Sequence, residues 1–290
     1  MALSSDASQN MPTTSLTQGA GALSRLFNFD LPAIKQSGQV FVEQVDRSTI
    51  RRVLDIASGT GTWTIAAAQA HPEVQFVGIE RNPHLVEQAR TQARSHHLEN
   101  VSFTVMDPFG PLDLPDASFD LVNARYLVGQ LLAEAWPQAL HSFMRVVRPG
   151  GSIRLTETDL PISSSTAYAQ LGGLISQALF QTKRSFSPTG RLLSMTPVLK
   201  QLLQDAGCQQ VRHAVAEVNF SAGTPAHEEL AQDIRQTYRL VLPFLVAAAV
   251  TTQQEVEQLY QQLLTELGSE QFDAVAYSLI AWGIRPSGQA

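Results

Sequence analysis

A short apolar strand that runs into a glycine-containing turn and then into a helix is the feature that most constrains this chain. Residues 52–63 read RVLDIASGTGTW, and a helical stretch continues the segment to Ala70. Small residues in such a turn let a ligand lie against bare backbone at the N-terminus of the helix. The segment therefore predicts a ligand-binding turn at the edge of an α/β sheet.

An acid ends the next predicted strand. Residues 74–79 are an apolar run followed by Glu80, about twenty residues past the glycines of the turn. A carboxylate in this place can accept hydrogen bonds from both hydroxyls of a ribose. The turn and Glu80 together predict a cofactor that contains a nucleoside.

The chemistry of the turn discriminates between two such cofactors. A dinucleotide fingerprint has glycine or alanine at its sixth position, where this chain has Thr64. Asp55 stands at the end of the strand, where its carboxylate would repel a pyrophosphate but attract a cationic amino-acid group. S-adenosylmethionine has no phosphate and carries an ammonium and a sulfonium group. It is therefore the cofactor that the pattern favours.

Further landmarks follow in order along the chain. They are VLDIASGTG at 53–61, FVGIERNP at 76–83, a strand at 101–106 that ends at Asp107, the P-x-x-x-F-D approach to a strand at 119–125, and R-x-x-R-P-G-G at 145–151 before a strand at 152–157. This ordered set resembles the class I S-adenosylmethionine-dependent methyltransferases, in particular the small-molecule type. The segment from the fourth strand to Leu131 is also similar to secondary-metabolite methyltransferases of fungi and bacteria.

The resemblance implies a set of cofactor contacts. Its members are Asp55, Ala57, Ser58, Gly59, Gly61, Glu80, Arg81, Asp107, Pro108, Phe109, Asn123 and Arg125. The turn would hold the methionine portion with Asp55 orienting the ammonium, Glu80 would hold the ribose, and Asp107 would lie beside the adenine. For Glu80 and Asp107 the alternative is an exposed acid at a strand end. The family's commonest turn has glycine in place of Ala57, so the methyl group fits only if φ stays negative and no ligand presses on it.

The reaction class forces no catalytic residue, because methyl transfer from a sulfonium is an in-line displacement that depends on alignment. Tyr126 and Asp159 are nevertheless candidates, since they follow the fourth and fifth strands near the expected methyl group. Tyr126 would shape the pocket or bond the acceptor, and the alternatives are a salt bridge of Arg125 and a core-facing Tyr126 ring. Asp159 would accept a proton, and the alternative is a turn cap. No group of histidines, acids and Cys208 has metal-ligand spacing, so no metal is expected.

The alternation of strands and helices predicts an α/β, Rossmann-like, doubly wound sheet. The resemblance implies seven strands, mostly parallel with the last antiparallel, and a helical cap or lid. The expected divisions are a disordered N-terminus at 1–19, a helical arm at 20–48, a cofactor-binding core at 49–160, a helical part of the cap at 161–205, and the end of the sheet at 206–290 with a lid insert at about 225–268. Such a lid would close an apolar chamber suited to a small molecule. The alternative is that these helices only cover the sheet or form a dimer face.

Composition excludes several classes of function. A net charge of −6 provides no basic face of the kind that nucleic acids need. The longest apolar run, at 240–250, is too short to span a bilayer, and the N-terminus does not read as a secretory signal. We therefore expect a soluble, cytoplasmic protein that acts on a small-molecule acceptor. Neither nucleic acid nor a membrane is expected as a partner, and a homodimer is possible.

The leading hypothesis is an S-adenosylmethionine-dependent methyltransferase acting on a small, largely apolar acceptor. Oxygen is the favoured atom, with nitrogen and carbon as alternatives. Three other readings stay open: an enzyme that uses the bound sulfonium to assist a cyclisation or rearrangement, a non-catalytic sensor or partner subunit, and a nicotinamide oxidoreductase. Asp55 argues against the last of these.

Overall fold

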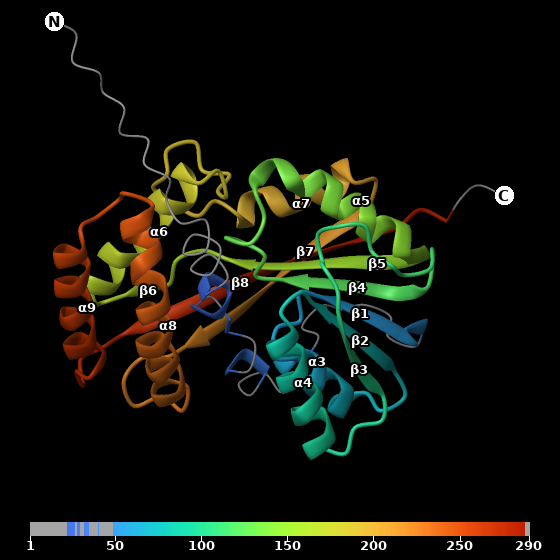
Figure 1. Ribbon diagram of the computed structural model, residues 1–290, viewed down its shortest axis with the longest axis horizontal. Helices are drawn as coiled ribbons and strands as arrows, with labels where there is room; N and C mark the ends of the chain where they lie inside the picture. The colour runs from blue at the N-terminus through green and yellow to red at the C-terminus, as the bar shows by residue number, and fades with distance from the viewer. Residues whose placement is uncertain (1–21, 27, 30–31, 35–39, 41–48, 288–290) are drawn as a thin grey trace, which may run out of the picture.

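The computed structural model describes residues 22–26, 28, 29, 32–34, 40 and 49–287 (Figure 1). Its strands are β1 (Arg52–Ile56), β2 (Gln75–Glu80), β3 (Val101–Val105), β4 (Phe119–Arg125), β5 (Val147–Thr158), β6 (Ile162–Ser163), β7 (Gln209–Asn219) and β8 (Ala274–Ile284). Its helices are α3 (Thr62–Ala70), α4 (Pro83–Ser95), α5 (Trp136–Val146), α6 (Thr166–Gln181), α7 (Leu199–Asp205), α8 (His227–Ala247) and α9 (Gln253–Leu267). Residues 22–26 and 32–34 are also helical.

The strands form one sheet in the order β3-β2-β1-β4-β5-β8-β6, with β7 paired to the other edge of β8. The pairs from β3 to β5 are parallel, whereas β8 is antiparallel to β5, β6 and β7. The predicted α/β fold with an antiparallel last strand is confirmed. The sheet has eight strands where seven were expected. The additional strand is β6, which has only two residues and therefore shows no periodic pattern in the sequence. The chain order reverses between β1 and β4, where ligands bind in open α/β sheets.

The register of the sheet places polar side chains in one row at its centre. Asp55 on β1 pairs with Asn123 on β4, and Asn123 pairs with Arg154 on β5. The row continues to Trp282 on β8. Because directly paired residues point to the same face of a sheet, these side chains meet beneath α3.

Helices cover both faces of the sheet and one end of it. In Figure 1, α3 and α4 lie below the sheet and α5 and α7 lie above it. α6, α8 and α9 pack on one another beside the sheet, and α6 also contacts β6. Within the expected cap segment at 161–205 the two helices therefore separate, since α7 packs on α5, β7 and β8.

Local sequence explains where the outer helices begin. Asn82 caps α4 by accepting a hydrogen bond from the His84 amide, and Pro83 occupies the first turn, where its missing N–H is no loss. Thr252 and Glu255 form a capping box at the start of α9. These polar signals fix the helix boundaries independently of the core.

The N-terminal segment is attached to the core through apolar side chains. Leu23, Leu26 and Phe29 are buried, and the Phe29 ring stacks on Phe220 with centroids 6.1 Å apart. The predicted disordered stretch 1–19 lies outside the described residues, as does most of the predicted arm at 20–48. The division into arm, core and lid remains a prediction.

None of the helices among the described residues is both long enough and apolar enough to cross a bilayer.

Candidate functional site

The turn after β1 is held in place by backbone hydrogen bonds. The Ser58 amide donates to Ile79 O at 3.0 Å, and the Gly61 amide donates to Ser58 O at 2.9 Å. Gly59 has φ +57, and a Cβ placed on it would meet no atom within 4 Å. Gly61 has φ +77, and a Cβ there would lie 2.6 Å from the Phe103 ring. One glycine therefore leaves open space beside the turn, and the other permits close packing beneath it.

Ala57 has a left-handed backbone, so it does not meet the condition of a negative φ that the sequence analysis set for its methyl group. Its φ is +53. Buried Tyr126 at the end of β4 has φ +51 and donates its amide proton to Thr156 O at 2.8 Å. Left-handed conformations in residues with a Cβ are strained and concentrate at functional sites. The hydrogen bonds from Ser58 to Ile79 and from Tyr126 to Thr156 hold the backbone of both residues in this conformation.

Replacing Ala57 by glycine is expected to stabilise the protein by about 1 kcal/mol, because glycine adopts a positive φ without strain. Urea unfolding of Ala57→Gly and wild type measures the difference. Ala66→Gly, in the middle of α3, is the matched control and should destabilise by about 1 kcal/mol. A loss of stability in Ala57→Gly would show that the turn is unstrained at this position.

Glu80 is fixed beside the turn by two backbone donors. Its Oε2 accepts from the Gly59 amide at 3.3 Å, and its Oε1 accepts from the Asn82 amide at 2.9 Å. The side chain is only 7% exposed, yet it lines the cleft described below. Each carboxylate oxygen has a second lone pair, so the pair can still accept from two adjacent hydroxyls.

Asp55 lies under the turn rather than in the cleft. Its carboxylate accepts from the Thr64 hydroxyl at 2.6 Å, from Asn123 Nδ2 at 2.8 Å and from the Arg125 guanidinium at 3.3 Å. The residue is fully buried, and this burial raises the pKa of Asp55 to about 7 despite those donors. The structure thus gives Asp55 partners within the protein, where the sequence had suggested a ligand ammonium.

Two arginines complete this buried polar cluster. Arg154 donates to Asn123 Oδ1 at 2.7 Å, and Arg125 pairs with Asp55. Both guanidinium groups lie over the Trp63 ring, at 5.0 Å for Arg125 and 5.7 Å for Arg154. Burial and the neighbouring Arg154 lower the pKa of Arg125 to about 9, so the group stays charged at neutral pH. The ring and the carboxylate therefore hold a cation in a fixed position at the end of β4.

A cleft of about 1120 Å³ opens over the turn, a volume at the upper end of what ligand pockets reach. Of the residues predicted for the site, it is lined by Ala57, Ser58, Gly59, Glu80, Arg81, Arg125 and Tyr126. These residues come from the ends of β1, β2 and β4. The strand order therefore brings together residues as far apart in the chain as Ala57 and Tyr126.

The remaining predicted residues do not line the cleft. Gly61 packs on Phe103, and Asn123 is buried against Asp55 and Arg154. Asp107 accepts from the Phe109 amide at 3.1 Å and forms a turn that also contains Pro108. Asp159 accepts from the amides of Leu160 and Leu193 at 3.0 and 3.3 Å. Both of these donors are backbone amides of the protein, which favours a structural role for Asp159 over that of a proton acceptor.

Tyr126 lines the cleft with its hydroxyl turned into the protein. That hydroxyl lies 3.1 Å from Ser278 Oγ on β8, and burial raises the pKa of Tyr126. A phenol with a raised pKa and an internal partner shapes a wall and is a poor proton acceptor. The buried ring and its internally bonded hydroxyl match the core-facing alternative for Tyr126, although the residue also forms part of the cleft wall.

Sequence reasoning expected an arm and a lid insert over the site, but it named none of the residues of the opposite wall as site residues. The cleft is also lined by Ala22, Ser24, Arg25, Asn28 and Pro32 from the N-terminal segment and by Glu229, Asp233, Arg239, Leu240 and Pro243 from α8. Nearer the turn, Thr60, Thr62, Asn82, Leu85, Gln88 and Gln130 were also missed. Most residues of this last set could have been predicted, because they flank the turn or Glu80 in the sequence. No motif marks the first group, since only tertiary packing brings α8 over the sheet.

Glu157 is a further buried acid near the cleft that the sequence did not single out. It accepts from the amides of Leu127 and Val128 at 2.7 and 3.4 Å and so anchors the loop that follows Tyr126. Burial raises the pKa of Glu157 from its ordinary 4.5 to about 8. The folded protein therefore keeps a proton on this group at a pH where the unfolded chain has lost it.

Stability is expected to fall between pH 5 and pH 8 because of Glu157. Over this range Glu157 is ionised in the unfolded chain but protonated in the folded protein. The stability that the folded protein has below about pH 4.5 is therefore partly lost as the pH approaches 8. Glu157→Gln should match wild type near pH 5 and exceed it at pH 8 by on the order of 2–4 kcal/mol. Urea unfolding at pH 5, 6.5 and 8 tests this. Exposed Glu87 on α4 is the control, since Glu87→Gln removes a surface pair with Arg94 and should show no such gain.

Comparison with known proteins agrees with this geometry. A family model described as a methyltransferase domain matches residues 49–263. Demethylmenaquinone methyltransferase of Deinococcus radiodurans is 36% identical over 113 residues, which are 39% of this chain and 45% of that protein. The C-methyltransferase UbiE of ubiquinone and menaquinone biosynthesis in Hahella chejuensis is 28% identical over 178 residues, or 56% of this chain and 70% of that protein.

A solved structure shows the same fold. Phosphoethanolamine N-methyltransferase 2 of Haemonchus contortus, in complex with S-adenosyl-L-methionine, superposes with a TM-score of 0.50 at 15% identity, covering 92% of this chain and 57% of that chain. The alignment with the Deinococcus relative spans less than half of that protein.

The chain belongs to the class I S-adenosylmethionine-dependent methyltransferases. The family match covers both the turn and α8, which are the two walls of the cleft. The local geometry fits the family's cofactor, because the open space beside Gly59 admits a ligand and Glu80 presents a fixed carboxylate to it. The cofactor expected from the sequence is therefore that of the family.

Proposed function

We propose that this protein transfers a methyl group from S-adenosylmethionine to a small, largely apolar acceptor inside a lidded cleft. One observation carries the proposal: the turn after β1 forms one wall of the cleft, and α8 with the N-terminal segment forms the other. A nucleoside cofactor bound along the turn would then have its methyl group directed at a space that α8 covers. The apolar part of that wall includes Leu240 and Pro243 on α8 and Leu85 on α4.

The cofactor would be held by both negatively and positively charged side chains. Glu80 would accept from the ribose hydroxyls, and the open side of Gly59 would receive the ligand backbone. Arg125 would pair with the carboxylate of the methionine portion, because the residue lines the cleft and its guanidinium is fixed by Asp55 and Trp63. Arg81 and Ser58 also line the cleft and are further predicted contacts.

Alignment and exclusion of water would supply most of the acceleration. An in-line displacement needs the attacking atom, the methyl group and the sulfur on one line, and a fixed wall favours that geometry. Tyr126, held by its backbone bond to Thr156 and its hydroxyl contact with Ser278, would form that wall. Bound S-adenosylmethionine supplies the electrophilic methyl group, and a base is needed only when the acceptor must lose a proton.

The favoured acceptor atom is oxygen, with nitrogen and carbon as alternatives. One relative is named as a C-methyltransferase and another as a demethylmenaquinone methyltransferase, which supports carbon as the first alternative to examine. The mixed lining of the cleft, to which α8 contributes Glu229, Arg239 and Leu240, accommodates an apolar molecule that carries a polar substituent.

Calorimetric titration with S-adenosylhomocysteine, with NADH as the control, tests the cofactor. Micromolar binding of S-adenosylhomocysteine and no heat with NADH are expected. Transfer of a labelled methyl group to a panel of phenols, amines and activated carbon acids then tests the reaction. Binding without transfer to any acceptor would favour the sensor or the sulfonium-assisted rearrangement, and binding of NADH alone would overturn the proposal.

A further inference from the structure

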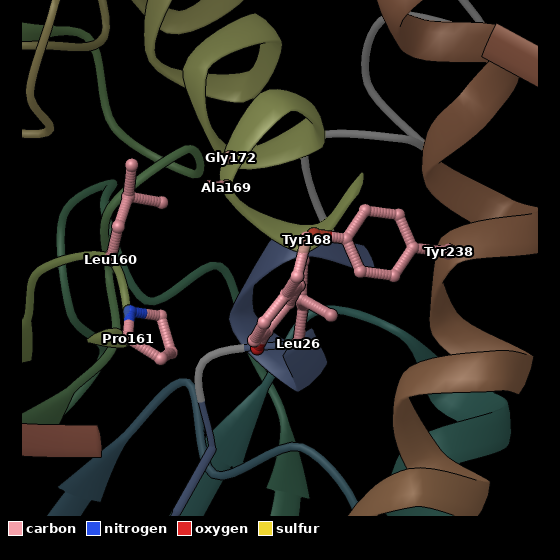
Figure 2. Close-up of a pocket in the computed structure, with 7 residues that line it drawn as sticks. All are labelled: Leu26, Leu160, Pro161, Tyr168, Ala169, Gly172 and Tyr238. Carbon is pink, nitrogen blue, oxygen red and sulfur yellow. The ribbon is translucent and has the colours of Figure 1, made fainter. Parts of the chain in front are cut away.

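A small pocket between α6, α8 and the N-terminal segment is too small for an organic ligand (Figure 2). Its volume is about 20 Å³, which is room for one water molecule. Tyr168 and Tyr238 lie on one side of it, and Leu160 and Pro161 lie on the other. The pocket is therefore packing space. A larger unused surface lies at the edge of the sheet, along β7.

β7 forms one edge of the sheet, and among the described residues only β8 pairs with it. The strand is long, with 11 residues, and it contains neither proline nor lysine, which often protect such an edge from further pairing. Its register with β8 is regular from Arg212 to Asn219. In the described part of the chain, the outer edge of β7 is therefore a row of backbone donors and acceptors without a neighbouring strand.

The hydrogen bonds to β8 identify the residues whose backbone faces outward. Phe220, directly after β7, donates its amide proton to Ala274 O at 3.0 Å. Along a strand of an antiparallel pair, every second residue directs its N–H and C=O groups to the same edge. Counting back from Phe220, the even-numbered residues face β8. The backbone groups of His213, Val215 and Glu217 therefore face the outer edge.

The side chains of the same three residues lie on one exposed face of the sheet, because residues two apart in a strand point to the same side. His213, Val215 and Glu217 are all exposed, and Val215 is 60% exposed. Their neighbours on β8 are uncharged, since His213 pairs with Ala281 and Glu217 pairs with Tyr277. The exposed row thus has a basic group, an apolar group and an acid at equal intervals.

This row is complementary to a second copy of itself. Two identical strands that pair antiparallel in a symmetric dimer are related by a two-fold axis perpendicular to the sheet. If that axis passes beside Val215, each Val215 faces the partner's Val215, and each His213 faces the partner's Glu217. The outward-facing backbone groups then lie opposite one another as hydrogen-bonded pairs. One register therefore satisfies the backbone and matches the side chains.

The neighbouring symmetric registers lose this match. An axis beside Glu217 would place the two acids directly opposite each other, which destabilises a strand pair. An axis beside Ala214 would place Glu217 opposite the partner's Val211, and an axis beside Ala216 would place it opposite the partner's Val215. The charge pattern of β7 thus selects the axis at Val215 and selects a second copy of the chain as the partner.

We propose that two copies of this chain associate through β7, antiparallel about a two-fold axis at Val215, with His213 of each copy bonded to the partner's Glu217. The sheets of the two copies would then form one continuous sheet, an association in which main-chain hydrogen bonds supply affinity and side chains supply specificity. None of these three residues lines the cleft, so each copy keeps its own cleft.

Sedimentation velocity of the full chain over a range of concentrations measures the association. Wild type is expected to show a monomer–dimer equilibrium. His213→Glu places two carboxylates opposite each other on both sides of the axis and should raise the dissociation constant about ten-fold or more. The double variant His213→Glu with Glu217→His exchanges the two partners and should restore the wild-type value to within about three-fold. Ser102→Glu, at an exposed position of β3 on the opposite edge, is the matched control and should change nothing.

A single cysteine tests the register. Val215→Cys places the thiols of the two copies opposite each other at the axis, where a disulfide can form. Diamide oxidises the pair, joining the two sulfurs as it is itself reduced. Most of the Val215→Cys dimer should become cross-linked, whereas Glu217→Cys, which faces the partner's His213, should not. The native Cys208 is buried and should leave wild type without a cross-link.

Circular dichroism and titration with S-adenosylhomocysteine show that each variant is folded, because a change on β7 leaves the cleft intact. A wild-type protein that stays monomeric at every concentration would overturn the proposal. So would a dimer that is unaffected by His213→Glu, a double variant that does not recover, or equal cross-linking of the two cysteine variants. Each of these results is independent of whether the protein transfers methyl groups.

Discussion

Glu80→Ala is expected to weaken binding of S-adenosylhomocysteine at least 100-fold while leaving the fold intact. Two ribose hydroxyls donating to one carboxylate form charge-assisted hydrogen bonds, each contributing about 1.5–3 kcal/mol, and about 1.4 kcal/mol is ten-fold in affinity. The carboxylate also orients the Gly59 and Asn82 amides at the rim of the cleft. Calorimetric titration measures the loss, and circular dichroism checks the fold.

Two further variants sharpen this experiment. Glu80→Gln keeps the shape and one acceptor oxygen, so its affinity should fall about ten-fold, between wild type and the alanine variant. Glu87→Gln removes an acid that lies exposed on α4 and pairs with Arg94, and it should bind like wild type. Unchanged affinity in Glu80→Ala would show that the ribose is held elsewhere.

Asp55→Ala is expected to have its main effect on stability, with a loss of about 3–5 kcal/mol. The substitution leaves Arg125 and Arg154 buried without their nearest carboxylate and removes the acceptor of Thr64 and Asn123. Urea unfolding at pH 8, where the Asp55 carboxylate with its pKa of about 7 is ionised, measures the change. Asp116→Ala, which breaks an ion pair between Arg145 and an exposed side chain, should lie within about 1 kcal/mol of wild type.

The two substitutions should separate two roles that the motif alone does not distinguish. Glu80→Ala loses ligand affinity, whereas folded Asp55→Ala should keep affinity for S-adenosylhomocysteine within about ten-fold of wild type, the limit set by a displaced Arg125. A stable Asp55→Ala protein without affinity would instead restore the interpretation of Asp55 as the partner of the ligand ammonium. Titration of both variants under conditions where each is folded decides between them.

Much of the fold and part of the site follow from local patterns. The apolar strands at 53–56 and 119–125, the glycines of the turn and Glu80 are encoded within short windows, because strand, turn and helix each impose a period or a backbone requirement. The strand order that brings Ala57, Glu80 and Tyr126 to one cleft is common to open α/β sheets. The sequence therefore predicted one wall of the site, the cofactor and the fold class.

Other features required the folded chain. The sequence placed Asp55 at a strand end, but the register of β1, β4 and β5 decided that Asn123 and Arg154 would surround it. The sequence does not indicate the positive φ of Ala57, because that angle depends on the hydrogen bond between the turn and β2. Asp159 accepts from the Leu193 amide, 34 positions later, only because the chain folds back at that point.

The sequence by itself determined the α/β sheet, the turn after β1 and the acid after β2, because each depends on residues that are neighbours in the chain. Tertiary structure alone decided which residues of the expected lid insert line the opposite wall. α8 contributes Leu240 and Pro243 to the cleft. These side chains acquire their roles from packing between segments that are more than a hundred residues apart, and such packing leaves no periodic signal in either segment.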